Sequence, residues 1–419
     1  MTLYPALIGH AQALLDEVLK FEYPADAVTT RYFRRNGTLG HRDRGVIAEA
    51  VFAVLRHKLE FAQFAQSGSG PLTRRLTLLG LAYVAGMPEV ISKVGPKEAD
   101  WLERISTVER ESLSLEARCN FPDWMLARFR ERFPDSEIER LANALNRPAP
   151  LDLRANVLKA TRENALSNLR AAGLEAEPTP WAPCGIRLVG KPALQNLPLF
   201  IDGGVEVQDE GSQIVAHLLA VRRGEMVVDF CAGAGGKTLA LGASMRSTGR
   251  LYALDVSAKR LANLKPRLAR SGLSNVHPMA IDSERDPRLK RMAGKADRVL
   301  VDAPCSGIGT LRRNPDLKWR QNSATIQGLR KSQDAILAAA ARLVRPGGRL
   351  VYATCSLLEE ENGAIANAFA QAHPDFEEVD VRETLRSQQI ALDTGPRLEL
   401  WPHIHGTDGF FAAIFERRT

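Results

Sequence analysis

The stretch Val227–Thr238, which reads VVDFCAGAGGKT, constrains the fold more than any other part of the 419-residue chain. An apolar run ends in an acid, passes through a glycine-rich loop and continues into the apolar residues Leu239–Leu241. This order is typical of a strand, a loop and a helix that bind a nucleotide-like ligand. Glycines let backbone N–H groups approach the ligand, and the first turn of the helix points its positive end at it.

The spacing of the loop separates three ligand types. A phosphate-binding P-loop requires Gly where Cys231 stands, so Gly236–Thr238 matches only the end of that motif. A dinucleotide fingerprint requires its final Gly where Thr238 stands. The S-adenosylmethionine type of loop fits best, and the alternative is a glycine turn that only packs a helix against a sheet.

The composition is that of a globular protein of two or three domains, with 45% apolar and 25% charged residues. A formal charge of +7 favours an anionic partner. Five cysteines form no CxxC pair, which favours reduced thiols over a secreted or zinc-binding protein. The apolar stretch Leu76–Met87 is too short to span a bilayer and predicts a buried helix. We therefore expect a cytoplasmic, monomeric protein without a membrane or metal partner.

Residues 1 to about 120 show helical periodicity with few strand-like runs. One helix is expected over Leu7–Val18, and another around Ile47–Leu55 after a cap at Asp43. Between them, residues 31–44 carry five arginines against one acid: Arg31, Arg34, Arg35, Arg42 and Arg44. A solvated loop and an RNA phosphate contact are the two interpretations.

Prolines at 122, 134, 148 and 150 indicate a boundary within residues 120–150. After it, Leu151–Arg154 and Ile186–Val189 predict strands that flank a helix over Thr161–Ala171. Such a small α/β unit can bind RNA on its sheet, although it lacks an aromatic stacking signature.

From about residue 206 the chain alternates regularly between strand and helix patterns. Strand-like runs end at Phe230, Asp255, Asp282, Asp302 and Thr354, and a helix pattern runs through Ile336–Val344 until Pro346–Gly348 stops it. The fold class is therefore α/β, with a doubly wound parallel sheet. Ligands of such sheets lie beyond the carboxyl ends of the strands.

Polar side chains follow these strand ends. Asp255, about twenty residues after the glycine loop, is placed to accept hydrogen bonds from ribose hydroxyls. Asp282 either contacts the adenine side of the cofactor or caps the next turn. Two cysteines, Cys305 and Cys355, follow strands whose backbones, if neighbours, lie about 4.8 Å apart, so both thiols would face one pocket. For Cys119 and Cys184 the favoured interpretation is a small buried side chain.

A cysteine, an acid and a methyl donor together indicate one reaction. Carbon 5 of cytosine is a poor nucleophile until a thiolate adds at carbon 6. Asp302 is placed to bond the ring nitrogen, and to donate a proton it would need a pKa raised by burial. A second thiol can help remove the carbon-5 proton.

With these motifs the second half of the chain resembles the Nop/Sun family of RNA cytosine-5 methyltransferases. The helical front, with Ala25–Val28 and Gly40–Arg44, resembles a NusB-type RNA-binding domain. The whole chain is thus similar to the RsmB type, which modifies 16S ribosomal RNA. The resemblance implies that Cys355 is the nucleophile and Cys305 the release cysteine. Spacing alone does not order them, and the Pro-Cys pattern of DNA methyltransferases would nominate Cys305.

The resemblance also implies S-adenosylmethionine as cofactor. The residues implied to bind it are Cys231, Ala232, Gly233, Ala234, Gly235, Gly236, Lys237, Asp255, Arg260, Asp282 and Asp302. The family loop usually reads Cys-Ala-Ala-Pro-Gly-Gly-Lys, whereas Gly233 and Ala234 replace the Ala-Pro pair here. This departure bears on the subfamily and its RNA target more than on the cofactor.

Basic side chains follow the Asp302–Gly307 loop. Residues 312–331 carry six of them against one acid, and Trp319 among them could stack on a base: Arg312, Arg313, Lys318, Arg320, Arg330 and Lys331. Residues 285–298 add six more against two acids. The target cytosine is expected to be unpaired or swung out of its stack.

The expected organisation has three parts. A helical NusB-like RNA-binding domain occupies 1–120, linker helices with a small RRM-like subdomain occupy 121–205, and a class I Rossmann-like methyltransferase domain occupies 206–419. The rival functions are a catalytically silent RNA-binding assembly factor and a methyltransferase acting on tRNA or DNA cytosine.

Overall fold

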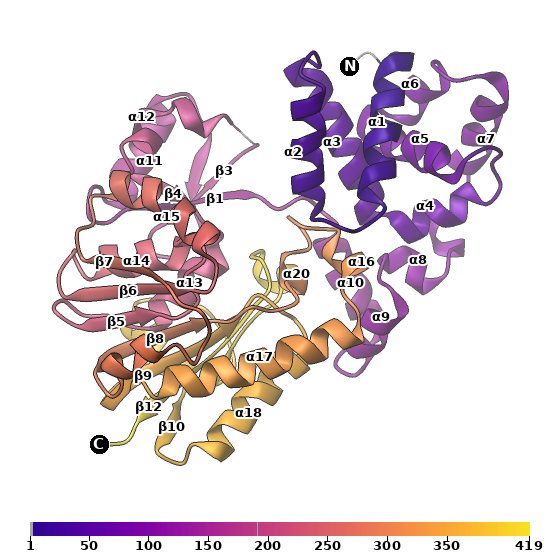
Figure 1. Cartoon of the computed structure of the whole chain (residues 1–419). Helices are drawn as coiled ribbons and strands as arrows, with labels where there is room; N and C mark the ends of the chain where they lie inside the picture. Colours follow the sequence, from indigo (N-terminus) through magenta and orange to yellow (C-terminus); the bar gives the residue numbers. More distant parts are fainter. Residues whose placement is uncertain (1–2, 191) are drawn as a thin grey trace. The chain divides into compact units, whose positions relative to one another are not determined.

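The computed structural model describes residues 3–190 and 192–419. Packing divides the chain into two compact units (Figure 1). The helical unit contains the residues up to Pro148 together with Thr310–Ser323, and the α/β unit contains Ala149–Gly309 and Ala324–Thr419. The domain boundaries expected near residues 120 and 205 stay a prediction.

Short amphipathic helices build the helical unit around one apolar core, and α5 is its most buried element. The expected helix over Leu7–Val18 and the buried helix around Leu76 are confirmed. The helices are α1 Pro5–Val18, α2 Ala25–Arg35, α3 His41–Arg56, α4 Lys58–Ala65, α5 Leu72–Ala85, α6 Met87–Ile91, α7 Pro96–Ser106, η1 Arg110–Ser112, α8 Leu115–Cys119, α9 Asp123–Arg130, α10 Asp135–Leu145 and α16 Leu317–Arg320.

Two local expectations for this unit are wrong. Asp43 does not cap α3, because the helix begins at His41 after Gly40, and the Asp43 carboxylate instead accepts a hydrogen bond from the Tyr4 hydroxyl at 2.8 Å. The arginines of residues 31–44 do not form a loop: three lie on α2 and two on α3. The high charge of α2 hides its apolar stripe, which is limited to Ala25, Val28, Thr29 and Tyr32.

Thr310–Ser323 interrupts the methyltransferase half of the sequence but packs within the helical unit. The ammonium of Lys318 is buried and donates to the Arg56 carbonyl at 2.8 Å and to Asn146 Oδ1 at 2.7 Å. The indole of Trp319 donates to the Leu55 carbonyl at 2.8 Å and packs against the helical core. The predictions that Trp319 stacks on a base and that Lys318 belongs to a basic substrate surface are therefore wrong, because their polar groups are already paired inside a protein core.

The first part of the α/β unit is a small antiparallel sheet of order β2-β3-β1-β4. The two predicted strands and the helix between them are confirmed. Glu206 on β4 forms ion pairs with Arg267 and Arg270, which connect this small sheet to helix α15 (Ala258–Ser271), one of the helices that cover the large sheet. The elements are β1 Leu151–Ala155, α11 Arg162–Ala171, β2 Ala176–Pro178, β3 Gly185–Leu188, η2 Leu194–Asn196, α12 Pro198–Ile201 and β4 Val205–Val207.

The large sheet has eight strands in the order β10-β12-β9-β8-β5-β6-β7, with β11 paired to β12. Strands β5 to β9 are parallel, and β12 runs antiparallel to β9, β10 and β11. The expected doubly wound sheet is thus mixed at its C-terminal end. The strands are β5 Met226–Asp229, β6 Arg250–Asp255, β7 Val276–Ala280, β8 Ala296–Asp302, β9 Val344–Thr354, β10 Phe376–Val379, β11 Leu398–Leu400 and β12 Phe410–Arg417.

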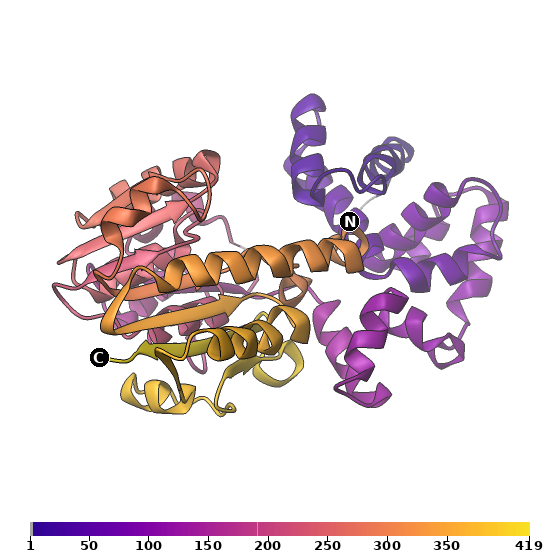
Figure 2. The same cartoon turned by 60° about the horizontal axis from the view of Figure 1, so that its bottom comes forward.

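Helices cover both faces of this sheet, and alternate strand residues point into two separate cores. Val227 packs with α13, α14 and α15, whereas its neighbour Val228 packs with α17 and α18. Figures 1 and 2 show the long helix α17 along one face. The remaining elements are α13 Glu210–Leu218, α14 Gly236–Ser244, α15 Ala258–Ser271, η3 Pro287–Met292, η4 Ile308–Thr310, α17 Ser323–Ala341, η5 Glu359–Glu361, α18 Gly363–Ala372, α19 Val381–Ser387 and α20 Pro402–His405.

The end of α17 differs from the prediction. The helix stops at Ala341, and β9 already begins at Val344, so Pro346–Gly348 lies within β9 and does not stop the helix. The pairing of β8 and β9 shifts register at this point: Ala296 pairs with Val344 and Arg298 with Arg349, so Pro346–Gly348 lies in the irregular part of β9 between these pairs. Apolar residues that continue from a helix into a buried strand carry no signal for the boundary.

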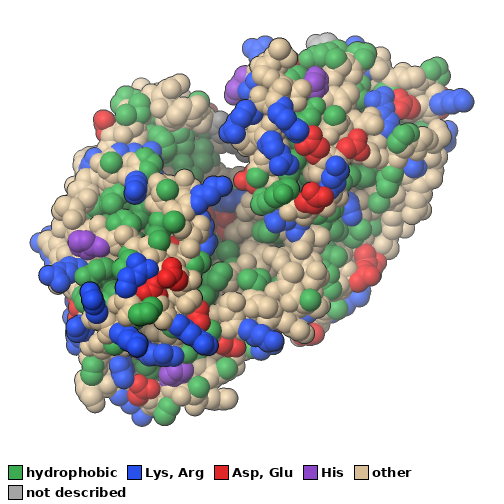
Figure 3. Space-filling model, in the orientation of Figure 1, with side chains coloured by type: hydrophobic (Ala, Val, Ile, Leu, Met, Phe, Trp, Pro, Cys, Tyr) green, Lys and Arg blue, Asp and Glu red, His purple; other side chains and the backbone are tan. Residues whose placement is uncertain are grey.

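None of the helices in the described ranges is both long and apolar enough to cross a membrane. Figure 3 shows Lys and Arg side chains gathered on the α/β unit in the region of β5 to β9. The exposed basic residues of the 285–298 segment are Arg285, Arg288, Lys290, Arg291 and Lys295.

Candidate active site

The glycine loop connects β5 to α14 at the point where the strand order reverses between β5 and β8. Gly235 precedes the helix with φ +82°, and a Cβ there would stand 2.2 Å from Leu264 Cδ1 of α15. Gly233 has φ +56°, and no atom lies within 4 Å of the place of its missing Cβ. Gly235 is therefore required by packing, whereas Gly233 leaves open space along the loop.

Asp255 and Arg260, two of the predicted cofactor residues, lie beside this loop. The Asp255 carboxylate is buried and accepts from the Gly233 N–H at 2.8 Å, from the Ser257 N–H at 2.7 Å and from Arg260 at 2.9 Å. The last residue of β6 thus holds the glycine loop in place. Asp282 lies two residues beyond β7 and is exposed, at the outer strand of the sheet.

Asp229 closes β5 beneath the loop and was not predicted as a site residue. Its Oδ2 accepts from the Thr238 hydroxyl at 2.6 Å, and its buried Oδ1 has no hydrogen-bond partner among residues 3–190 and 192–419. Burial raises the pKa of Asp229 to about 7, and the nearby carboxylates Asp302 and Asp255 add to the rise. A buried carboxylate with a spare oxygen suits a cationic group of a ligand.

The two predicted thiols meet. Cys305 follows β8 and Cys355 follows β9, these strands are parallel neighbours, and the Sγ atoms are 3.3 Å apart. The pKa of Cys305 is raised well above its usual value, first by the hydrogen bond with Cys355 and then by burial. The contact with Cys355 and burial therefore both favour the protonated form of Cys305.

Lys237 and Asp302 form an ion pair beside these thiols, with Nζ and Oδ2 2.8 Å apart. The Lys237 ammonium also stands 5.2 Å from the ring centre of Phe410. Burial acts to lower the pKa of Lys237, but the charge of Asp302, its hydrogen bond and the charge of Cys355 outweigh it, and the pKa is raised. A cation is thus held within electrostatic reach of Cys355 and Asp302.

Two glycines allow the Cys355 loop to pack closely. Gly309 N–H donates to the Cys355 carbonyl at 2.9 Å, and Gly409 N–H donates to the Gly309 carbonyl at 2.8 Å. A Cβ on Gly309 would stand 2.2 Å from the Gly409 oxygen and 2.8 Å from the Cys355 oxygen. Only glycine fits at this contact, which fixes the backbone that carries the Cys355 thiol.

The sequence analysis missed Glu361, a buried acid that contacts both cysteine loops. It accepts from the Ser306 N–H at 2.9 Å and from the hydroxyls of Ser306 and Ser356. Glu361 stands six residues after Cys355, and its only sequence signal is that it ends the acidic run Glu359–Glu361 directly before the polar Asn362. An acidic run is ordinarily taken as a solvated surface.

The other cysteines take no part in this arrangement. Cys119 is fully buried and Cys184 packs against the small core, as expected. Burial raises the pKa of Cys119 to about 12, and burial likewise raises the pKa of Cys184 and of Cys231. Within the described part of the chain, no cluster of three or more His, Cys, Asp or Glu side chains could hold a metal ion.

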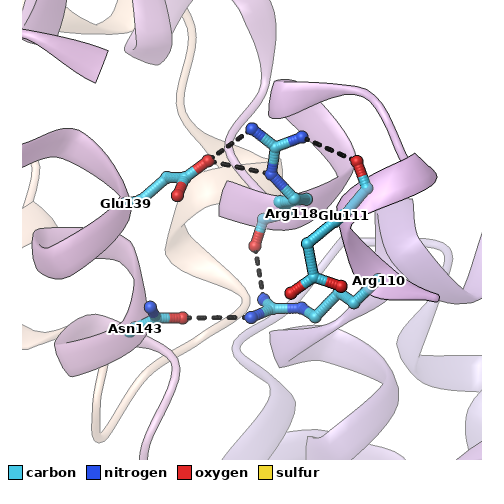
Figure 4. Close-up of a pocket in the computed structure, with 5 residues that line it drawn as sticks. All are labelled: Arg110, Glu111, Arg118, Glu139 and Asn143. Carbon is cyan, nitrogen blue, oxygen red and sulfur yellow. Dashed lines mark hydrogen bonds and ion pairs between the residues drawn. The ribbon is translucent and has the colours of Figure 1, made fainter. Parts of the chain in front are cut away.

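A polar pocket of about 380 Å³ lies in the helical unit, between η1, α8 and α10 (Figure 4). Arg118 pairs with Glu139, and Arg110 donates to the Arg118 carbonyl and to Asn143. Arg118 is thus paired with an acid of the wall and Arg110 with the neighbouring Glu60, so the pocket does not resemble an anion site.

Comparisons with known proteins match this chain along its length. The family model for 16S rRNA methyltransferase RsmB/F matches residues 216–416, and a model for the ferredoxin-like domain of RsmF/B-like methyltransferases matches residues 121–195. A Synechocystis protein named "Probable ribosomal RNA small subunit methyltransferase B" is 39% identical, covering 90% of this chain and 91% of its own length. A Yersinia pseudotuberculosis protein named "Ribosomal RNA small subunit methyltransferase B" is 30% identical, covering 90% of this chain and 91% of its own length.

Solved structures agree. The crystal structure of PH0851 covers 100% of both chains with a TM-score of 0.78 at 26% identity, and a methyltransferase homolog protein from Pyrococcus horikoshii covers 74% of this chain and 100% of its own with a TM-score of 0.63 at 27% identity. The eight-stranded sheet and glycine loop are thus a Rossmann-like methyltransferase fold that uses S-adenosylmethionine. On this sequence identity, together with the paired thiols at the strand ends, the chain belongs to the RsmB/F family of ribosomal RNA methyltransferases.

Proposed function

We propose that the chain methylates carbon 5 of a cytosine in 16S ribosomal RNA, with Cys355 as nucleophile and Cys305 as the residue that assists release. The observation that carries this proposal is the 3.3 Å separation of the two Sγ atoms beside the Lys237–Asp302 pair. We place the reaction in the cytoplasm, where thiols stay reduced, and expect the chain to act as a monomer.

The cofactor fits the residues that surround the loop. S-adenosylmethionine supplies an electrophilic methyl group on a positively charged sulfur. The spare oxygen of Asp229 suits the cationic end of the cofactor, and the open side of Gly233 lets the backbone approach it. Asp255 would accept from ribose hydroxyls, and Cys231–Lys237, Arg260, Asp282 and Asp302 complete the proposed cofactor contacts.

In the proposed reaction the Cys355 thiolate adds to carbon 6 of the cytosine, and the electrons of the ring double bond move to carbon 5. To stabilise the negative charge that develops on the ring, Asp302 must carry a proton on the oxygen that faces the ring nitrogen, and the Lys237 ammonium, 2.8 Å from Oδ2, adds a positive charge beside it. Carbon 5 then takes the methyl group. Because Cys355 is by now a neutral thioether, it no longer opposes ionisation of Cys305, which can release its proton to solvent.

The Cys305 thiolate then accepts the carbon-5 proton. The electrons of the broken C–H bond restore the ring double bond, and the bond between carbon 6 and Cys355 breaks, which returns the Cys355 thiolate. Burial also raises the pKa of Cys305, and this cause remains after Cys355 has been alkylated, so the Cys305 thiolate is a strong base.

RNA contacts are proposed on basic surfaces within each unit. In the helical unit, Arg31 lies 5.2 Å from the ring centre of the exposed Tyr23, and Arg34 and Arg42 are exposed nearby on α2 and α3. In the α/β unit, the exposed basic residues of 285–298 form the second surface. Both suit phosphate contacts, which are largely independent of sequence.

The two cysteine variants test the proposal. Cys355→Ala should lower transfer of labelled methyl to 16S RNA by at least about 1,000-fold, because it removes the nucleophile. Cys305→Ala should instead accumulate a covalent protein–RNA adduct that migrates slowly in a denaturing gel and disappears on nuclease treatment. Full activity of Cys355→Ala contradicts the proposal, and so does preferred methylation of transfer RNA or duplex DNA.

A further inference from the structure

The two cysteine loops are joined through one buried side chain. Glu361 is fully buried, and its Oε2 accepts from the hydroxyl of Ser306, next to Cys305, and from the hydroxyl of Ser356, next to Cys355. Its Oε1 accepts from the Ser306 N–H at 2.9 Å. The two serine oxygens are themselves 3.1 Å apart. The carboxylate therefore lies where the ends of β8 and β9 meet.

Further contacts hold Glu361 in place. Gln333 of α17 donates from one Nε2 to Glu361 Oε1 at 3.0 Å and to the Pro304 carbonyl at 2.9 Å. The Tyr352 hydroxyl, on β9, donates to the Glu361 carbonyl at 2.6 Å. All three side chains are buried, so the contacts do not compete with solvent. The acid is thus anchored to the scaffold and to both loops at once.

The neighbouring Asn362 makes a second connection, to the Cys355 loop alone. Its Oδ1 accepts from the Thr354 hydroxyl at 2.6 Å, and its Nδ2 donates to the Ser356 carbonyl at 3.0 Å. The residues on either side of Cys355 are therefore both bonded to Asn362. Glu361 differs from it because it alone reaches the Cys305 loop as well.

We propose that Glu361 is a positioning residue that sets the separation and orientation of the Cys305 and Cys355 thiols through Ser306 and Ser356. This inference rests on the proposed roles of the two cysteines. Glu361 does not touch the reacting atoms; it acts through the serine that follows each thiol. Fixing reacting groups in an attack geometry contributes several orders of magnitude in rate, and a misplacement of about 1 Å can cost about 100-fold.

A carboxylate suits this position better than an amide. Four donor groups point at Glu361: the Ser306 N–H, two hydroxyls and the Gln333 amide. A carboxylate offers only acceptors, whereas the side chain of Gln would place its own two N–H donors against the hydroxyls. The shape is conserved in Glu361→Gln, but both serines must reverse their hydrogen bonds.

The test measures thiol geometry and chemistry separately. In the full-length chain, Glu361→Gln should slow single-turnover methyl transfer to 16S RNA by about 100-fold and leave the Kd for S-adenosylmethionine within about twofold. It should also slow formation of a Cys305–Cys355 disulfide under the oxidant diamide by at least about tenfold, since that rate reports the approach of the two sulfurs. Glu359→Gln, an exposed acid in the same turn, is the matched control and should match the wild type in all three.

Variants that remove one serine hydroxyl at a time test whether Glu361 acts through Ser306 and Ser356. Ser356→Ala should slow adduct formation, whereas Ser306→Ala should permit adduct formation and delay release. If Glu361→Gln lowers only the unfolding midpoint, with cross-linking and transfer by the folded fraction unchanged, the positioning role is wrong. If Cys355→Ala abolishes transfer while Glu361→Gln does not slow it, the inference fails and the proposed function stands; if Cys355→Ala remains active, the proposed function fails first.

Discussion

Asp229 shows how the surroundings of one residue change its chemistry. Sequence places it at the end of a strand, before the glycine loop, but only packing reveals that it is fully enclosed and that one oxygen lacks a partner within the described ranges. An unpaired buried carboxylate is costly in its charged form. The raised pKa, about 7, is the consequence.

Replacing this carboxyl should change how stability depends on pH. Asp229 ionises near pH 4 in the unfolded chain and near pH 7 in the folded one, so the unfolded state loses this proton first as pH rises. The free energy of unfolding should therefore decrease between about pH 4 and 7, by on the order of 2–4 kcal/mol. Asp229→Asn should lack this decrease in urea titrations of the cofactor-free protein.

The exposed Asp282→Asn is the control and should keep the wild-type pH profile. Parallel profiles for Asp229→Asn and the wild type would show that Asp229 ionises alike in both states.

At the scale of elements, sequence pattern predicts what is encoded locally. The strand, glycine loop and helix around Gly235 follow from apolar periodicity and glycine spacing, and the meeting of Cys305 and Cys355 follows from strand ends that share one sheet edge. Glu361 escapes such a prediction, because an acidic run has the same pattern whether it faces water or a buried serine pair. Trp319 escapes it too, since its core is formed by residues more than two hundred positions away.

The glycine loop gives a prediction about the packing of α14 against α15. Gly235→Ala combines a left-handed backbone with a Cβ 2.2 Å from Leu264, so it should lower the free energy of unfolding by about 2–5 kcal/mol. Gly233→Ala, which has φ +56° and open space around it, should cost only about 1–2 kcal/mol. Urea unfolding of both variants checks this.

The two variants should also differ in cofactor affinity. A methyl group at residue 233 enters the space proposed for S-adenosylmethionine, so Gly233→Ala should weaken binding at least about tenfold while the fold stays intact. Equal stability losses for the two variants would contradict the assignment of Gly235 to packing, and unchanged affinity in Gly233→Ala would contradict the proposed cofactor path.

At the scale of the whole molecule, the helical unit is built from two separate stretches of sequence. The second, Thr310–Ser323, begins three residues after the Asp302–Gly307 loop and is held by Lys318, Trp319 and Asp316, which accepts from the Ala25 N–H at 3.2 Å. The chain therefore leaves the methyltransferase fold and returns to it within one loop. The helical unit is a partner of that loop in folding, and it is not simply an N-terminal addition.

Removing residues 1–148 should therefore also destabilise residues 310–323, which remain in the shortened protein but lose the core against which they pack. In a protein containing only residues 149–419, Lys318 loses Arg56 and Asn146, and Trp319 loses the Leu55 carbonyl and its apolar neighbours. We expect this protein to aggregate in size-exclusion chromatography and to bind a hydrophobic dye, because the 310–323 segment has lost its core. A second version, in which residues 311–322 are replaced by a Gly/Ser linker of equal length, should be monodisperse and bind S-adenosylmethionine in calorimetry. If the unmodified protein is already monodisperse and binds the cofactor as tightly as the full chain, the segment folds without the helical unit, and its contacts there do not stabilise the methyltransferase fold.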